Sequence, residues 1–150
     1  MKKIYKTQSS KETIALGKEF AKAIQKQKNN HGAIVLCFTG DLGAGKTTFI
    51  KGFAKELGIA KAITSPTFVI AKFYKTKKTI GKTLIHIDAY RLKDEKDLYT
   101  LHFNEMKANK NVILVIEWAE LIKKAVPKNS LWLIFSHGSH EHERTIKIKK

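Results

Sequence analysis

The feature that most constrains this chain is a glycine-rich segment, residues 40–47, that fits the phosphate-loop pattern G-x-x-x-x-G-K-[ST] at every fixed position. An apolar run over residues 33–38 precedes it and predicts a buried strand. Apolar residues at helical spacing follow the loop, and Gly58 predicts where that helix stops. Strand, loop and helix in this order surround an anion with backbone N–H groups and a helix N-terminus, which indicates a phosphate site.

The residue types at this loop predict binding of ATP with Mg²⁺. We expect Lys46 to reach the β- and γ-phosphates and Thr47 to place its hydroxyl on the metal. A second apolar run, residues 112–116, predicts a central strand buried on both faces, and it ends on Glu117. Ligands of open α/β sheets lie beyond the carboxyl ends of the strands, so we expect Glu117 to be the acidic partner of Mg²⁺. The alternative is an ordinary glutamate at a strand end.

Two further segments carry candidate functional residues. The predicted strand 83–88 and the residues after it place His86, Asp88 and Tyr90 on one face. Asp88 is therefore a candidate metal or water ligand, or a cap for the helix that follows. Residues 63–68 set three hydroxyls, Thr67 among them, beside a proline. This segment is either a switch that senses the γ-phosphate or a turn entering the next strand.

The remaining chain predicts alternating strands and helices. Ser9 and Glu12 fit a capping box, which starts a helix that runs to about residue 27. The other expected elements are strands at 4–7, 67–74, 131–135 and 145–148, a polar helix at 94–106, and a solvated hairpin loop at 75–82 with a basic partner patch as its alternative. The last two strands form a closing antiparallel hairpin.

The turn of that hairpin contains His137, His140 and His142. Three histidines this close suggest a transition-metal site, but a mobile loop offers no preorganised geometry. We favour the loop without a metal.

Composition predicts one domain, residues 1–150, in a reduced, cytoplasmic setting. The N-terminus lacks the apolar block of a signal peptide, and no apolar run is long enough to span a bilayer. The single cysteine, Cys37, is expected to be a small buried hydrophobe. The net charge of +16 either attracts an acidic partner such as RNA or reflects dispersed lysines, since only Arg91 and Arg144 are arginines.

Taken together, these segments resemble the TsaE family, also called YjeE. The resemblance covers nearly the whole chain, and its most specific parts are Ser-Pro-Thr-Phe at 65–68, His-x-Asp-x-Tyr-Arg at 86–91 and Glu-Trp at 117–118. Two departures stand out. Ala119 follows Glu-Trp where the family usually has Pro, and His102 follows Leu101 where the family usually has Gly. The first concerns the path of the chain after the acid, and the second concerns a partner surface.

The resemblance implies an α/β, phosphate-loop NTPase-type three-layer fold with a mixed central sheet, parallel at its centre and antiparallel at its edges. It implies an ATPase of tRNA threonylcarbamoyladenosine biosynthesis. Such a protein works with TsaB and TsaD counterparts, reaches tRNA through that complex, and binds neither membrane nor DNA. Its ATP cycle supports turnover of the complex that modifies the adenosine next to the anticodon.

The resemblance also implies roles for single residues. Catalysis would fall to Lys46, Asp88 and Glu117, and Mg²⁺ to Thr47 and Glu117. Trp118 would shape the site or a partner surface. The nucleotide would be held by Ser9, Asp41, Gly43, Ala44, Gly45, Lys46, Thr47, Thr48 and His140.

Two rival functions are weighed against this interpretation. A small-molecule kinase on the same fold usually closes an arginine-bearing lid over the phosphates, which a chain with two arginines can hardly build. A basic RNA-binding module is supported by charge alone.

Overall fold

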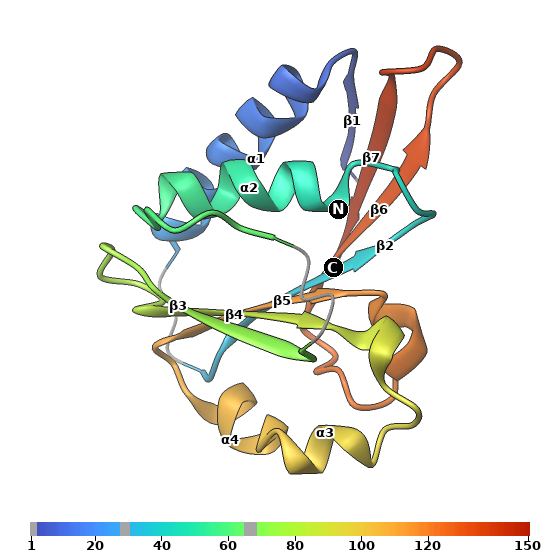
Figure 1. Cartoon of the computed structure of the whole chain (residues 1–150). Helices are drawn as coiled ribbons and strands as arrows, with labels where there is room; N and C mark the ends of the chain where they lie inside the picture. The colour runs from blue at the N-terminus through green and yellow to red at the C-terminus, as the bar shows by residue number, and fades with distance from the viewer. Residues whose placement is uncertain (1–2, 28–30, 65–68) are drawn as a thin grey trace.

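The computed structural model describes residues 3–27, 31–64 and 69–150, and Figure 1 shows a central sheet with helices on both faces. Within these residues the sheet has seven strands in the order β1-β7-β6-β2-β5-β4-β3. The strands are β1 (Lys3–Thr7), β2 (Ile34–Thr39), β3 (Ala71–Lys75), β4 (Thr83–Asp88), β5 (Val112–Glu117), β6 (Leu131–His137) and β7 (Arg144–Lys149). The helices are α1 (Ser10–Gln25), α2 (Lys46–Glu56), α3 (Asp97–Thr100) and α4 (Phe103–Ala108), with short 3₁₀ helices η1 (Ala89–Arg91) and η2 (Ala119–Ile122).

The sheet is mixed in the way that the resemblance to the TsaE family implies. Strands β6, β2, β5 and β4 run parallel at its centre, while β7 and β1 at one edge and β3 at the other are antiparallel to their neighbours. The closing β6–β7 hairpin is confirmed. The expected mixed α/β fold is therefore confirmed, and the carboxyl ends of the parallel strands share one edge of the sheet.

Helices cover both faces of the sheet, and two apolar cores result. Alternate residues of β2 divide between them: Leu36 and Phe38 join the core beneath α1 and α2, whereas Val35 and Cys37 join the core on the other face with residues of α3 and α4. Figure 1 shows α1 and α2 together on one side and α3 and α4 on the other. Cys37 is buried as predicted, and burial raises the pKa of its thiol to about 12.

Helices α1 and α2 touch through bare backbone. A Cβ atom on Gly17 would lie 2.2 Å from the carbonyl oxygen of Phe49, and one on Gly52 would lie 2.0 Å from that of Ile14. Real side chains do not reach such distances, so glycine is required at both positions for this close approach. The contact fixes the start of α1 relative to the helix that follows the phosphate loop.

The start of α1 confirms the predicted capping box with one difference. The Ser9 hydroxyl accepts a hydrogen bond from the Glu12 amide at 3.1 Å. The Glu12 carboxylate reaches back one residue further than expected, to the amide of Gln8 at 2.9 Å. The helix ends at Gln25, two residues before the predicted end.

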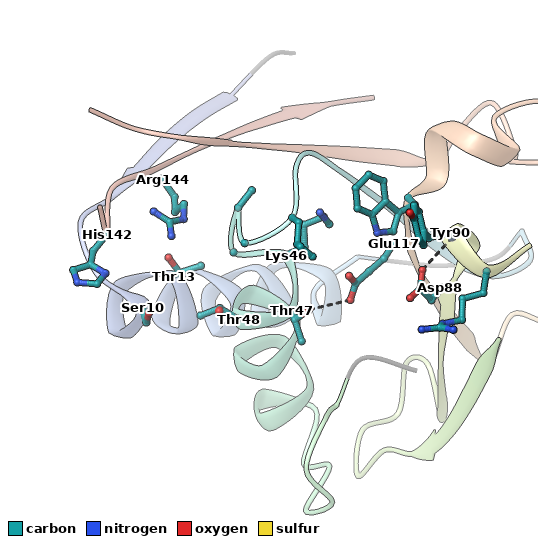
Figure 2. A pocket seen from close by; sticks show the side chains of 16 residues that line it. Ser10, Thr13, Lys46, Thr47, Thr48, Asp88, Tyr90, Glu117, His142 and Arg144 are labelled. Carbon is teal, nitrogen blue, oxygen red and sulfur yellow. Dashed lines mark hydrogen bonds between the residues drawn. The ribbon is translucent and has the colours of Figure 1, made fainter. Parts of the chain in front are cut away.

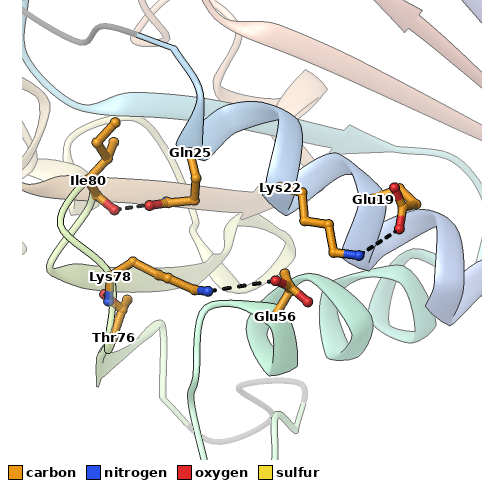
Figure 3. Close-up of polar contacts among 7 residues, drawn as sticks. All are labelled: Glu19, Lys22, Gln25, Glu56, Thr76, Lys78 and Ile80. Carbon is orange, nitrogen blue, oxygen red and sulfur yellow. Dashed lines mark hydrogen bonds and ion pairs between the residues drawn. The ribbon is translucent and has the colours of Figure 1, made fainter.

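The lysine-rich loop between β3 and β4 is less solvated than predicted. It connects an antiparallel hairpin, but it also contacts the C-terminal ends of both large helices (Figure 3). Gln25 donates to the carbonyl of Ile80 at 2.9 Å, Lys78 lies 3.6 Å from the Glu56 carboxylate, and the amide of Lys77 donates to the carbonyl of Leu57 at 2.9 Å. These contacts hold the hairpin against the helical layer.

The predicted continuous helix over residues 94–106 is wrong. The segment forms two short helices, α3 and α4, because His102 between them adopts φ = 55°, in the left-handed region. This is the position where the resembling family usually carries glycine. The strand predicted from residue 67 begins at Ala71, and the predicted functional segment 65–68, with Thr67, lies outside the described residues. In the described ranges, no helix is long and apolar enough to cross a membrane.

Replacing His102 with glycine is expected to stabilise the protein. A left-handed conformation costs a residue with a Cβ about 1–2 kcal/mol, which glycine avoids. Glycine also makes the unfolded chain more flexible, and this offsets part of the gain in stability. We expect the free energy of unfolding to rise by about 0.5–1 kcal/mol, measured by urea denaturation. The matched control is His102→Ala, which keeps the Cβ strain and removes the exposed 3.7 Å pairing with Glu105. Equal stability of the two variants would contradict the assignment of strain.

Candidate functional site

The phosphate loop adopts the conformation that its glycines permit. Gly40, Gly43 and Gly45 have φ values of 129°, 74° and 98°, which favour glycine, and α2 begins directly after Gly45. Helix α2 has Gly45 as its N-cap residue, which offers no side chain to its first backbone amides. Its first backbone amides are therefore available to an anion, and the helix adds partial positive charge at the same point.

Lys46 is buried at the start of α2, and its ammonium group stays within the loop. It donates to the carbonyl oxygens of Gly40 and Asp41, the second at 3.0 Å, and lies 4.5 Å from the centre of the Trp118 ring. Burial lowers the pKa of Lys46, while nearby carboxylates, Glu117 first among them, act in the opposite direction. An anion in the cavity would add to that stabilisation of the charged form.

The strand-end acid, Glu117, faces the phosphate loop. Glu117 is 4% exposed, and its Oε1 accepts a hydrogen bond from the Thr47 hydroxyl at 3.3 Å. The same oxygen lies 2.9 Å from Nε2 of His86, which is fully buried in β4. The register of β4 and β5 places Asp88 directly opposite Glu117. Two carboxylates and a hydroxyl thus meet at the carboxyl edge of the sheet.

Asp88 acts as a cap in this structure, which is one of its three predicted roles. Its Oδ1 accepts a hydrogen bond from the amide of Tyr90 at 3.1 Å, at the start of η1. Burial raises the pKa of Asp88, the Tyr90 amide partly offsets this, and the charge of Glu117 raises it further. Because burial disfavours the ionised form, a carboxylate with a raised pKa binds a proton more readily than an exposed one, which suits a general base.

Replacing Asp88 with asparagine is therefore expected to stabilise the nucleotide-free protein at pH 7. The amide oxygen can still accept from Tyr90, and the buried charge is gone. The raised pKa also sets the sign of the pH dependence: the gain is present above that pKa and shrinks as the pH falls through it, because Asp88 itself becomes neutral. Thermal unfolding from pH 7 down to pH 4 measures this. The control is Asp94→Asn, an exposed aspartate that accepts from the Lys96 amide at 2.7 Å. An Asp88→Asn gain that is equally large at pH 4 would contradict the assignment.

These groups line one cavity of about 490 Å³. Figure 2 shows Thr13, His142 and Arg144 at one end, Glu117 and Asp88 at the other, and Lys46 and Thr47 between them. The lining residues are Ser10, Thr13, Leu42, Gly43, Ala44, Gly45, Lys46, Thr47, Thr48, Asp88, Tyr90, Arg91, Glu117, Trp118, His142 and Arg144. The volume falls within the range of small-molecule sites.

Of the predicted site residues that the structure describes, most line this cavity and three do not. The side chain of Ser9 caps α1, and its neighbours Ser10 and Thr13 line the cavity instead. Asp41 is exposed, and its contact with Lys46 is made by its backbone carbonyl. His140 lies exposed in the β6–β7 turn, where His142 is the histidine that lines the cavity.

Two lining residues to which the sequence analysis gave no role in the site carried a signal in the composition. Both arginines of this lysine-rich chain, Arg91 and Arg144, line the cavity. Arg144 lies beside Gly45, where an added Cβ would be 3.6 Å from its Cγ, and it donates to the backbone carbonyls of Glu141 and Glu143. Arginine suits phosphate because its planar guanidinium group can donate two parallel hydrogen bonds to it.

The donors present fit Mg²⁺ better than a transition metal. In the part of the chain that the structure describes, no three His, Cys, Asp or Glu side chains are placed to share a metal ion, the turn histidines included. Mg²⁺ is usually held by one or two carboxylates together with substrate phosphates and water. The Thr47 hydroxyl 3.3 Å from the Glu117 carboxylate, beside the phosphate loop, matches that donor set.

Comparisons with known proteins agree on one family. The family model described as "Threonylcarbamoyl adenosine biosynthesis protein TsaE" matches residues 7–146. The chain is similar to the tRNA threonylcarbamoyladenosine biosynthesis protein TsaE of Bacillus subtilis, with 44% identity over 112 residues, 74% of this chain and 67% of that protein. The Rickettsia prowazekii protein of the same name is 42% identical over 116 residues, 77% of this chain and 73% of that protein. The crystal structure of YdiB from Bacillus subtilis matches with a TM-score of 0.76 and 31% identity, covering 99% of this chain and 84% of that one.

Proposed function

Because the chain belongs to the TsaE family, a family of tRNA threonylcarbamoyladenosine biosynthesis, we propose that it is the Mg²⁺-dependent ATPase component of that machinery. The observation that carries the proposal is the Thr47–Glu117 contact at the mouth of an uncapped α2, inside a cavity large enough for a nucleotide. A phosphate loop and a strand-end acid held face to face are the parts that phosphate-loop NTPases use.

The phosphates of ATP would be held by residues 43–48. The first amides of α2 donate to phosphate oxygens, and Lys46 exchanges its carbonyl partners for the β- and γ-phosphates. This exchange gives a buried ammonium group, which now donates to two backbone carbonyls beside the Trp118 ring, charged partners in their place. Ser10, Thr13 and Arg144 line the far end of the cavity, and the remainder of the nucleotide would extend toward them.

Thr47 and Glu117 would hold Mg²⁺ with the phosphates. When bound, the ion neutralises charge that develops on the β- and γ-phosphate oxygens. Asp88, opposite Glu117 on the adjacent strand, would orient the attacking water and accept its proton. Trp118 would keep the Lys46 side chain in place through the ring contact already present.

The partners that we propose are the TsaB and TsaD counterparts, with tRNA reached through their complex. The test is a pull-down of this protein with both counterparts from the same cell, with and without ATP, together with measurement of free phosphate. Capture of the counterparts and faster phosphate release in their presence are expected. Failure of both would overturn the proposal.

Two further measurements separate the rival functions. Both arginines line the cavity, an arrangement that also serves phosphoryl transfer to a small molecule. Label from ATP that appears on an added nucleoside or sugar, with no free phosphate, would favour the kinase. Tight tRNA binding that falls steeply with salt and ignores ATP would favour a basic RNA-binding module.

A further inference from the structure

His86 is a buried polar side chain that the core does not require. It lies in the middle of β4 with no exposed surface. Since a carboxylate only accepts hydrogen bonds, Nε2 of the imidazole is the donor in the 2.9 Å contact with Glu117. Its other nitrogen, Nδ1, is buried and has no hydrogen-bond partner among the residues that the structure describes. An unpaired buried polar nitrogen costs free energy, and an apolar side chain at this position would avoid that cost.

The oxygen that His86 contacts is the one that faces the phosphate loop. Oε1 of Glu117 accepts from His86 on one strand and from Thr47 on α2. The carboxylate is therefore held from two elements at once, and its orientation is set before any nucleotide arrives. Side chains that hold a metal-binding carboxylate in this way usually alter metal affinity when they are removed.

We propose that His86 is a positioning residue, whose Nε2–H bond fixes the Glu117 carboxylate beside Thr47 in the orientation that Mg²⁺ requires. The inference rests on the proposed function, since it assumes that Glu117 meets Mg²⁺ with ATP. His86 itself touches neither nucleotide nor metal. Its removal should weaken the coupling between Mg²⁺ and ATP and leave the grip of the phosphate loop unchanged.

The experiment compares three variants in the full chain. His86→Gln keeps an N–H donor at about the reach of Nε2, His86→Asn is polar but one methylene shorter, and His86→Leu is apolar. Binding of the non-hydrolysable analogue AMP-PNP is measured by calorimetry in EDTA and across a Mg²⁺ titration. For His86→Leu and His86→Asn, the Mg²⁺ concentration that gives half of the maximal gain in AMP-PNP affinity should rise about 10- to 100-fold. For His86→Gln, this Mg²⁺ concentration should lie within about 3-fold of the wild-type value. The affinity for AMP-PNP in EDTA should be the same in the wild type and in all three variants.

Three results would overturn the inference. Wild-type Mg²⁺ titrations for both Leu and Asn would show that the bond positions nothing. An equally weakened Mg²⁺ response in His86→Gln and His86→Asn would show that the N–H donor at the reach of Nε2 does not matter. A loss of AMP-PNP affinity in EDTA as well would indicate general damage to the site. If His86→Leu does not fold, the comparison of His86→Gln with His86→Asn still tests the inference. A wild-type protein that binds no AMP-PNP would instead overturn the proposed function, so the two failures are distinguishable.

Discussion

Replacing Lys46 with alanine is expected to abolish productive ATP binding. The lysine is 6% exposed, and its ammonium group is the cation that the structure places inside the phosphate loop, on the carbonyls of Gly40 and Asp41. Charge-assisted hydrogen bonds contribute about 1.5–3 kcal/mol each. Losing two of them to phosphate oxygens weakens binding about 100-fold or more. Calorimetry with Mg²⁺ and AMP-PNP measures the loss directly.

A matched control separates this effect from a general loss of positive charge. Lys51 lies on the same helix and is exposed, so Lys51→Ala changes the net charge equally and should bind as wild type does. Thermal unfolding of the free proteins checks that Lys46→Ala is folded. A folded Lys46→Ala protein that hydrolyses ATP at the wild-type rate would refute the assignment of the phosphate site.

Replacing Glu117 should remove the dependence of ATP binding on Mg²⁺. The carboxylate is buried and accepts a hydrogen bond from the Thr47 hydroxyl at 3.3 Å, and Glu117 is the register partner of Asp88 on the neighbouring strand β4. Glutamine at this position keeps the size and an oxygen acceptor but loses the charge that a hard divalent cation requires. We expect AMP-PNP to bind Glu117→Gln with the same affinity in EDTA and in Mg²⁺, and hydrolysis to be lost. A Mg²⁺ titration of binding measures the first effect, and phosphate release measures the second.

The control for this prediction is Glu120→Gln. Glu120 lies three residues further on in η2 and is exposed, and its charge also acts on Lys46. Its loss should leave the Mg²⁺ titration unchanged. If Glu117→Ala and Glu117→Gln both titrate with Mg²⁺ as wild type does, Glu117 does not belong to the metal site.

The centre of the fold could be predicted because its patterns are local. Apolar runs buried on both faces identify β2 and β5, and fixed glycine spacing identifies the loop between β2 and α2. The break between α3 and α4 could not be predicted in the same way. Apolar residues at 98, 101 and 106 fit a continuous helix, and His102 is not a residue type that signals a left-handed turn as glycine does.

The candidate site was predicted only where a single segment carries it. Residues 43–48 and the acid at 117 follow from the phosphate loop and from the strand-end rule. Thr13 and Arg144 line the same cavity from opposite ends of the chain, and they meet because β1 pairs with β7 beside the hairpin. The contact of His86 with Glu117 likewise depends on the register of β4 and β5, which no local pattern sets.

The bare contact between α1 and α2 has a consequence for how this protein can respond to its ligand. With backbone against backbone at Gly17 and Gly52, no side chains lie between the two helices at these points that could repack and let one slide past the other. We therefore expect α1, which carries Thr13, and α2, which carries Lys46, to move together. If the cavity adjusts to a ligand, we therefore expect the change in the β6–β7 turn and in residues 88–91, and not between these two helices.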